Sequence, residues 1–96
     1  MKPSQALNLH RGELRRLVAR HGVSEPRVFG SVLAGLDGPD SDVDLLVSHG
    51  ARTTLLSLAA LQEAAEQLLG VPVDVLTPGA LPARIREQVL RTARPL

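Results

Sequence analysis

The stretch Asp-Val-Asp-Leu-Leu-Val at residues 42–47 constrains the fold more than any other part of the chain. Its later positions are apolar without alternation, which predicts a strand buried on both faces at the centre of a sheet. Such a strand needs other elements to cover it. Phe29 is the single aromatic residue among 96, so the covering side chains must be aliphatic. We therefore expect a small sheet packed against helices rich in Leu, Val and Ala.

The rest of the chain alternates helical and strand patterns, without repeats, low-complexity tracts or linkers. Pro72 indicates that the last strand enters at an edge of the sheet, because proline cannot donate to a central ladder. The patterns predict strands at 25–30, 42–47 and 71–76, and helices at 8–21, 31–36 (a single turn), 53–69 (capped by Thr53) and from Pro82 onward. This order predicts an α+β fold, a small mixed β-sheet flanked by helices, in one domain of residues 1–96.

Charge is distributed unevenly, although the net charge is only +1. Residues 1–36 balance to +4, residues 37–74 to −6 and residues 75–96 to +3. An acidic middle favours a central cation site over a basic nucleic-acid surface, and a chain with one aromatic ring lacks the stacking platform of single-strand binders. The absence of cysteine excludes disulfides and thiolate metal sites. No apolar run approaches the roughly 20 residues that span a bilayer, so we expect a cytoplasmic protein with no membrane partner.

Asp42 and Asp44 are the first candidates for chemistry. Residues two apart on a strand project from the same face, so their carboxylates repel unless a cation lies between them. Mg²⁺ prefers oxygen ligands of this kind and also binds phosphates. Acids at a loop-to-strand junction are also common turn formers, which is the simpler interpretation of Asp37, Asp40 and Ser41 and remains open for the bare pair.

Two further features accompany the acidic pair. Asp74 lies between Val73 and Val75, where a buried charge is costly unless it is paired or coordinates a metal. It is either an edge residue bonded to amides or to a C-terminal arginine, or a third carboxylate that ligates metal or accepts a proton. Gly30 and Ser31 follow a strand, where glycine permits close backbone approach and free amides can bind phosphate. The alternative there is an ordinary turn with a capping serine.

Together these residues spell Gly-Ser, ten residues, Asp-x-Asp, and an Asp on a later strand. This pattern resembles the polymerase-beta-type nucleotidyltransferases in their minimal (MNT) form, and the likeness covers nearly the whole chain. The resemblance implies the polymerase-beta-like fold and nucleotidyl transfer from ATP with two Mg²⁺ ions. It places Gly30 and Ser31 at the triphosphate, Asp42 and Asp44 on the metals, and Asp74 as the residue that completes the site and activates the acceptor.

In MNT antitoxins the acceptor is typically a tyrosine of a cognate HEPN ribonuclease toxin, which AMP neutralises; the resemblance therefore implies a HEPN partner. The chain departs from the common Gly-Ser-Arg-Ala-Arg-Gly by having Val32 and Ala34 in place of both arginines. Arg52, Arg84 and Arg86 are candidates to replace them. Two alternatives stay open: neutralisation of the toxin by binding alone, and transfer to a small-molecule acceptor. RNA is the least favoured acceptor.

Overall fold

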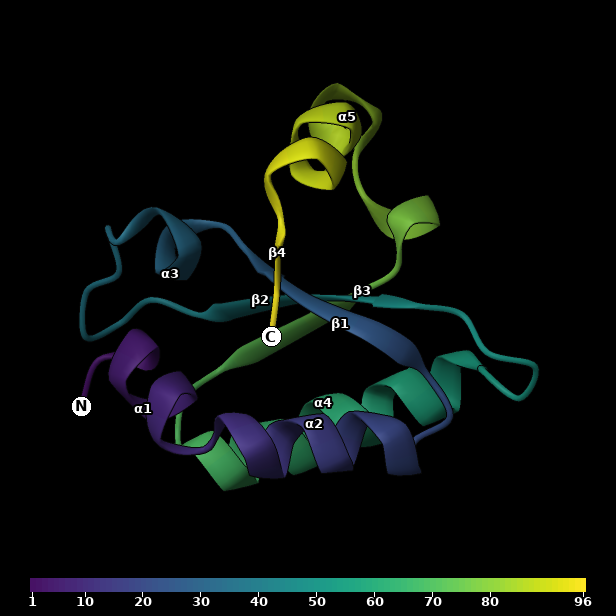
Figure 1. Ribbon diagram of the computed structural model, residues 1–96, viewed down its shortest axis with the longest axis horizontal. Coiled ribbons are helices and arrows are strands. Elements are labelled where there is room, and N and C mark those ends of the chain that lie inside the picture. The colour runs from purple at the N-terminus through teal and green to yellow at the C-terminus, as the bar shows by residue number, and fades with distance from the viewer.

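The computed structural model describes all 96 residues and contains one four-stranded mixed sheet (Figure 1). The strands are β1 (Ser24–Phe29), β2 (Val43–Ser48), β3 (Val73–Leu76) and β4 (Arg94–Pro95). Their order across the sheet is β3-β2-β1-β4. β1 is antiparallel to both β2 and β4, and β2 is parallel to β3. The predicted α+β class and mixed sheet are confirmed.

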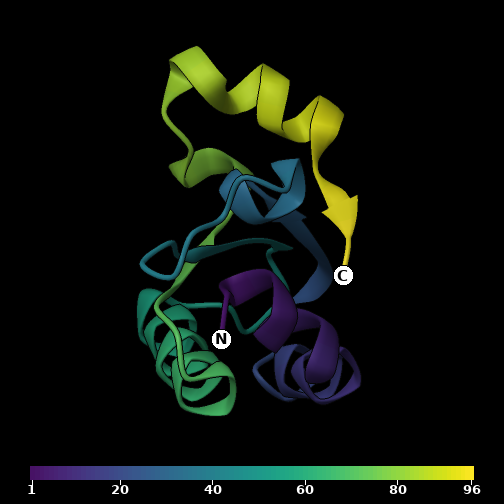
Figure 2. The same cartoon turned by 90° about the vertical axis from the view of Figure 1, so that its left-hand side faces the viewer.

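Helices cover both faces of the sheet unequally (Figures 1 and 2). Three lie below it in Figure 1: α1 (Pro3–Leu9), α2 (Arg11–Arg20) and α4 (Leu55–Leu69). Above it lies α5 (Ala83–Thr92), reached from β3 through a 3₁₀ turn at Pro78–Ala80. The short α3 (Ser31–Ala34) follows β1 directly. None of these helices is both long and apolar enough to pass through a bilayer.

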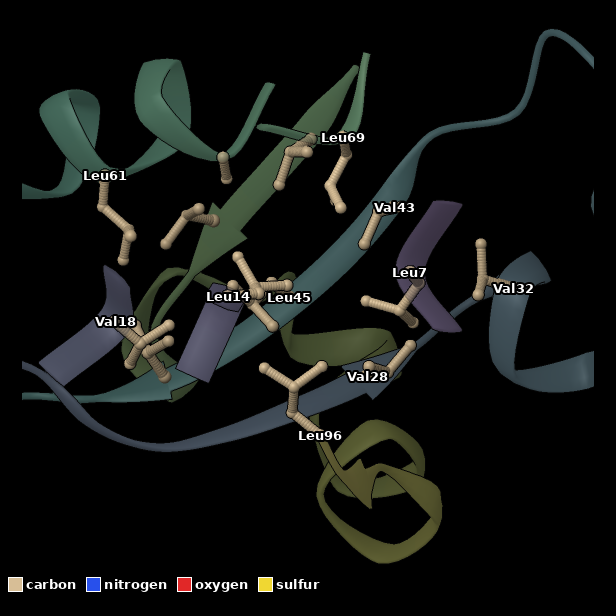
Figure 3. Packing of buried hydrophobic residues seen from close by; sticks show 14 of the residues in the cluster. Leu7, Leu14, Val18, Val28, Val32, Val43, Leu45, Leu61, Leu69 and Leu96 are labelled. Atoms are coloured by element: carbon tan, nitrogen blue, oxygen red, sulfur yellow. The ribbon is translucent and has the colours of Figure 1, made fainter. Parts of the chain in front are cut away.

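Two apolar clusters hold the layers together, and β2 contributes to both. The larger cluster has 16 buried residues on the side of α1, α2 and α4, and Figure 3 shows it from close by. Val43, Leu45 and Val47 point into it, whereas Leu46 belongs to a second cluster of four beneath α5. The prediction of a central strand apolar on both faces is therefore confirmed, although the strand runs over Val43–Ser48 and not over residues 42–47.

The expected N-terminal helix over residues 8–21 is wrong in its extent. The chain forms two helices that break at His10, whose backbone angles (φ −112°, ψ 19°) are not helical. Pro3 starts α1, since its missing N–H and fixed φ suit a first helical turn. Ala6 and Leu7 are buried in the larger cluster. A helix of seven residues with few apolar positions is too short to show a helical period, so α1 could not be recognised from the sequence.

Other boundaries shift by one or two residues. Thr54, not Thr53, caps α4: its Oγ1 accepts from the Ser57 N–H at 3.0 Å. The Thr53 hydroxyl instead accepts from the Gly50 N–H at 2.7 Å within the preceding turn. β3 begins at residue 73, not 71, and Pro82 is the N-cap of α5, not part of its first turn. Ile85 and Val89 of α5 pack in the second cluster and hold the helix on the sheet.

The C-terminal segment crosses the edge of the sheet and joins the larger core. Leu96 is only 4% exposed and packs in the larger cluster, although α5 lies on the opposite face (Figure 3). Its N–H donates to the Pro26 carbonyl oxygen at 2.9 Å. The Arg15 guanidinium donates to the Leu96 carbonyl oxygen, from Nε at 2.8 Å and also from Nη2. These contacts fix β4 against β1, and with it the end of α5.

β3 is the outer strand on the other side of the sheet, and its outward amides are satisfied by side chains of α4. The Val73 N–H donates to Glu66 Oε2 at 3.0 Å, and the Val75 N–H donates to Gln62 Oε1 at 3.1 Å. Glu66 and Gln62 are four residues apart and so lie on one face of the helix. This edge therefore presents no free N–H at either position.

Candidate functional site

The strand register brings Asp44 and Asp74 together. Asp44 is the direct partner of Asp74 in the parallel β2–β3 ladder and of Phe29 in the antiparallel β1–β2 ladder. Direct partners project from the same face of a sheet. That face is the one beneath α5, because Phe29 and Leu46 belong to the cluster there. Asp42 lies immediately before β2 and is exposed.

Gly30 connects this pair to α3. It caps the helix with φ +79° and ψ −153°, a backbone conformation that only glycine adopts readily. A Cβ on Gly30 would overlap the Asp44 carboxylate, which lies directly against the backbone here. Ser31 is the first residue of α3. Ten residues separate the Gly30-Ser31 motif from the Asp42/Asp44 pair in the sequence. The two motifs are therefore in contact through Gly30 and Asp44.

Asp44 has an unusual electrostatic environment. Burial, together with the negative charges of Asp74 and Asp42, raises its pKa to about 6. Asp42 and Asp74 are thus close enough to Asp44 to repel its charge. As they stand, no three acidic or histidine side chains of the chain are drawn together tightly enough to hold a metal ion. Three carboxylates around a half-buried charge are nevertheless a donor set that suits Mg²⁺, which would relieve the repulsion.

Asp74 differs from the sequence expectation in its burial. The apolar neighbours predicted a buried charge, but Asp74 is exposed because β3 is an edge strand whose other flank is open. It makes no ion pair with a C-terminal arginine and no hydrogen bond to an amide. The only ion pairs of the chain are His10–Glu13 and Glu87–Arg91. The carboxylate of Asp74 is therefore unengaged.

A cleft of about 790 Å³ opens between α3, α5 and the sheet, directly above Asp44. Gly30 and Asp44 lie in its wall, and most of the remaining lining is apolar. Leu33 of α3 and Ile85 of α5 contribute to it from the two helices. Clefts with apolar walls and a few convergent polar groups are typical small-molecule sites. Of the acidic candidates only Asp44 lines this cleft, and its volume lies in the range of small-molecule sites.

The two positions that lack arginine have different environments. Val32 is 9% exposed and packs in the larger core, whereas Ala34 lines the cleft. Of the arginines proposed as replacements, Arg86 is engaged elsewhere: its Nε and Nη2 donate to the carbonyl oxygens of Pro78 (3.0 Å) and Leu81 (2.7 Å). Neither Arg52 nor Arg84 lines the cleft.

Arg94 is the arginine that does line the cleft. Sequence reasoning missed it because its position depends on the pairing of β4 with β1. A two-residue strand that contains a proline gives no recognisable pattern in sequence. The negative net charge of residues 37–74 gave no indication of Arg94 either, because Arg94 lies outside that segment.

Asp37 has a structural role that turn formation does not describe. It is 8% exposed, and its Oδ2 accepts from the Ser4 N–H at 2.9 Å, which lowers its pKa. The loop between α3 and β2 is thereby fixed to the start of α1. Ser41 does form a turn as expected, since its hydroxyl accepts from the Gly38 N–H at 2.9 Å.

The fold and these residues define the class of protein. The family model described as the nucleotidyltransferase domain matches residues 7–95. The chain belongs to this family, and the resemblance inferred from the Gly-Ser and Asp-x-Asp spacing is confirmed. It is a nucleotidyltransferase.

The relatives narrow the class further. The protein adenylyltransferase MntA of Thermococcus cleftensis is 42% identical over 85 residues, which cover 88% of this chain and 83% of that protein. A protein adenylyltransferase of Methanocaldococcus jannaschii is 34% identical over 77 residues, covering 80% and 83%. The chain is thus a homologue of MntA-type protein adenylyltransferases.

Solved structures agree with this assignment. A structure described as a minimal nucleotidyltransferase superposes with a TM-score of 0.85 at 48% identity, covering 97% of this chain and 95% of that one. A crystal structure of a toxin–antitoxin with AMP-PNP has a TM-score of 0.74 at 17% identity, covering 88% and 69%. The second likeness shows the shared fold alone.

Proposed function

We propose that this chain is an antitoxin that transfers AMP from ATP to a tyrosine of a cognate HEPN ribonuclease toxin. The observation that carries the proposal is the register that pairs Asp44 with Asp74 beside Gly30. The relatives named as protein adenylyltransferases support a protein acceptor. The fold shared with MntA–HepT toxin–antitoxin structures supports a toxin as that protein. Residues 1–96 act in this proposal as one minimal nucleotidyltransferase domain.

Asp42, Asp44 and Asp74 would hold two Mg²⁺ ions. When bound, these ions neutralise phosphate oxygens and favour displacement at the α-phosphorus. The repulsion at the half-buried Asp44 supports this assignment, because a cation removes it. Gly30 and Ser31 would hold the triphosphate, since Gly30 allows the backbone to approach closely. ATP as the donor also favours a cytoplasmic location.

The chemistry of the transfer is a single displacement. The tyrosine hydroxyl oxygen forms a bond to the α-phosphorus of ATP, the bond from that phosphorus to the β-phosphate oxygen breaks, and pyrophosphate leaves. Asp74 accepts the proton of the hydroxyl. Its carboxylate suits this role because it is exposed and has no partner within the chain.

The test is transfer of label from α-labelled ATP to the toxin in the presence of Mg²⁺. We expect label on the toxin with the wild-type chain, and a loss of at least about 100-fold with Asp42→Asn, since even residues behind metal ligands cost 10–100-fold. Asp40→Asn is the matched control, because Asp40 is an exposed loop acid that, unlike Asp42, does not act on the charge of Asp44. Equal labelling by wild type and Asp42→Asn contradicts the proposal.

A second function, neutralisation by binding alone, is favoured by one observation: Ala34 in the cleft wall provides no charge for a phosphate. It predicts that the double variant Asp42→Ala, Asp44→Ala still neutralises the toxin, and that calorimetry detects no binding of Mg-ATP to the wild type. Loss of neutralisation in the folded double variant excludes it.

A further inference from the structure

A second depression, of about 230 Å³, lies between α1, α3 and β4. It opens on the side of α3 that faces α1, whereas the cleft of Asp44 opens on the side that faces α5 (Figure 2). Much of its base is apolar and includes Val28, which is buried in the larger core. Arg11 and Arg94 are its two charged residues, and no acidic side chain lines it. The depression therefore combines two positive charges with an apolar base.

The strand register directs the side chain of Arg94 toward this depression. Val28 is the direct partner of Arg94 in the β1–β4 pair, and direct partners project from the same face of a sheet. Val28 packs in the larger core, and so does Leu96, two residues after Arg94. Arg94 therefore projects on the side of α1, away from the face that carries Asp44 and Phe29. It is exposed and takes part in neither ion pair of the chain.

Arg11 brings the second positive charge from the start of α2. It is half-buried, and its Nη2 donates to Asn8 Oδ1 at 2.9 Å, but this amide oxygen carries no charge that neutralises it. Neither ion pair of the chain includes Arg11. The buried acid Asp37 is bonded to the Ser4 N–H and does not line the depression. Two cations that share a depression without an anion repel each other, and a bound anion removes that repulsion.

The charge and the size of the depression indicate a phosphate group as its ligand. Two guanidinium groups match the double charge of a phosphate dianion, whereas a carboxylate neutralises only one of them. The planar guanidinium also donates to two phosphate oxygens at once. Asn8 lines the depression as well, and its amide N–H groups are further donors. The volume is below the range of about 300–1,000 Å³ typical of drug-sized ligands, which suits a single phosphate group.

We propose that Arg11 and Arg94 form a binding site for a phosphate group, either the free ion or a small phosphomonoester, in the depression between α1, α3 and β4. The site does not depend on the proposed function, because it lies on the side of the sheet away from Asp44 and its ligand is not the nucleotide of the transfer reaction. Arg94 is held there by the pairing of β4 with β1, so binding orders only side chains.

The test is a chemical-shift titration of the full chain with inorganic phosphate, at pH 8, at constant ionic strength and with a chelator. We expect shifts centred on Asn8 and Arg94, with a dissociation constant on the order of 1 mM. Arg11→Ala and Arg94→Ala should each weaken binding by about 10-fold. Arg16→Ala in α2 and Arg91→Ala in α5 are the matched controls, because they remove the same charge outside the depression. Their affinities should stay within about twofold of wild type.

Two further ligands test the chemical class. Glycerol phosphate that binds within about threefold of inorganic phosphate supports a phosphomonoester as the ligand, and weaker binding supports the free ion. Acetate should bind about 10-fold more weakly than phosphate, because it carries one charge. Acetate that binds as tightly as phosphate overturns the assignment. Shifts centred on Gly30 and Ser31 also overturn it, since they place the ion at the cleft of Asp44.

Measurements of folding separate a contact from a structural role. Phosphate should raise the melting temperature of wild type, but not that of the double variant Arg11→Ala, Arg94→Ala. Arg11→Lys and Arg94→Lys, which keep the charge and lose the fork, should retain part of the affinity, and they replace the alanine variants if those fail to fold. Absence of phosphate binding to wild type, or equal losses in the variants and the controls, contradicts the proposal.

Discussion

Replacement of Asp44 by Asn should stabilise the metal-free protein while destroying its proposed site. Asp44 lies half-buried on the central strand, and burial together with the charges of Asp74 and Asp42 raises its pKa to about 6, from an ordinary value of 3.8. A raised pKa means that the folded state binds the proton more tightly than the unfolded state. The associated stability is complete below pH 4 and is lost as the pH rises through about 6.

The magnitude follows from the shift. About two pH units correspond to about 3 kcal/mol at 1.36 kcal/mol per unit. The carboxylate is only half-buried, so solvent screening reduces the effect to about 1–1.5 kcal/mol. At pH 8 and without Mg²⁺, Asp44→Asn should therefore be more stable than wild type by about this amount. At pH 4 the two proteins should be nearly equal, because wild-type Asp44 is then protonated.

Urea denaturation at pH 4 and pH 8 with a chelator measures this difference. Asp40→Asn serves as the control, since Asp40 is exposed and should change the free energy of unfolding by less than about 0.5 kcal/mol. Addition of Mg-ATP should reverse the order at pH 8 by stabilising wild type and not Asp44→Asn. If Asp44→Asn is less stable than wild type at pH 8 without Mg²⁺, the charge of Asp44 is not repelled in the folded state, and the reasoning is refuted.

Three further predictions concern residues that shape the site. Asp37→Asn should destabilise the chain at neutral pH; because the native contact lowers the pKa of Asp37, this loss should disappear in urea titrations as the pH falls below about 4. Gly30→Ala should lower the melting temperature and abolish nucleotide binding, since a Cβ there overlaps the Asp44 carboxylate, whereas Gly79→Ala, with open space around it, should do neither. Leu45→Ala should cost about 2–5 kcal/mol of unfolding free energy in urea titrations, because Leu45 is fully buried at the centre of the larger core.

The parts of this molecule that sequence could predict are those in which local pattern determines position. Asp44 lies on a strand that is visibly apolar and Asp42 precedes it by two residues, so a common face was expected from strand geometry. Gly30 precedes a turn that needs a positive φ, which glycine supplies. The pairing of Asp74 with Asp44 needed one more step, the family resemblance, because no local signal fixes which strand lies beside which.

The parts that sequence could not predict depend on contacts between distant segments. Leu96 reaches the larger core only because β4 crosses the sheet edge, and nothing near residue 96 indicates this. Arg94 lies in the wall of the cleft for the same reason. Asp37 looks like an ordinary loop acid, yet its partner lies 33 residues away. In each case tertiary packing determines the role of the residue, and no spacing of residues in the sequence indicates that role.

The side chains of Glu66 and Gln62 have a consequence for how this molecule meets other proteins. They occupy the outward amides of β3, and at the opposite border β4 is only two residues long and ends in Pro95. Neither edge strand offers a row of free N–H donors to a strand of another molecule. The sheet is therefore protected from extension by a further strand and from edge-to-edge aggregation. Another protein would therefore bind to helices and loops of this chain. Contacts with a toxin would be made by side chains and not by backbone hydrogen bonds across a sheet edge.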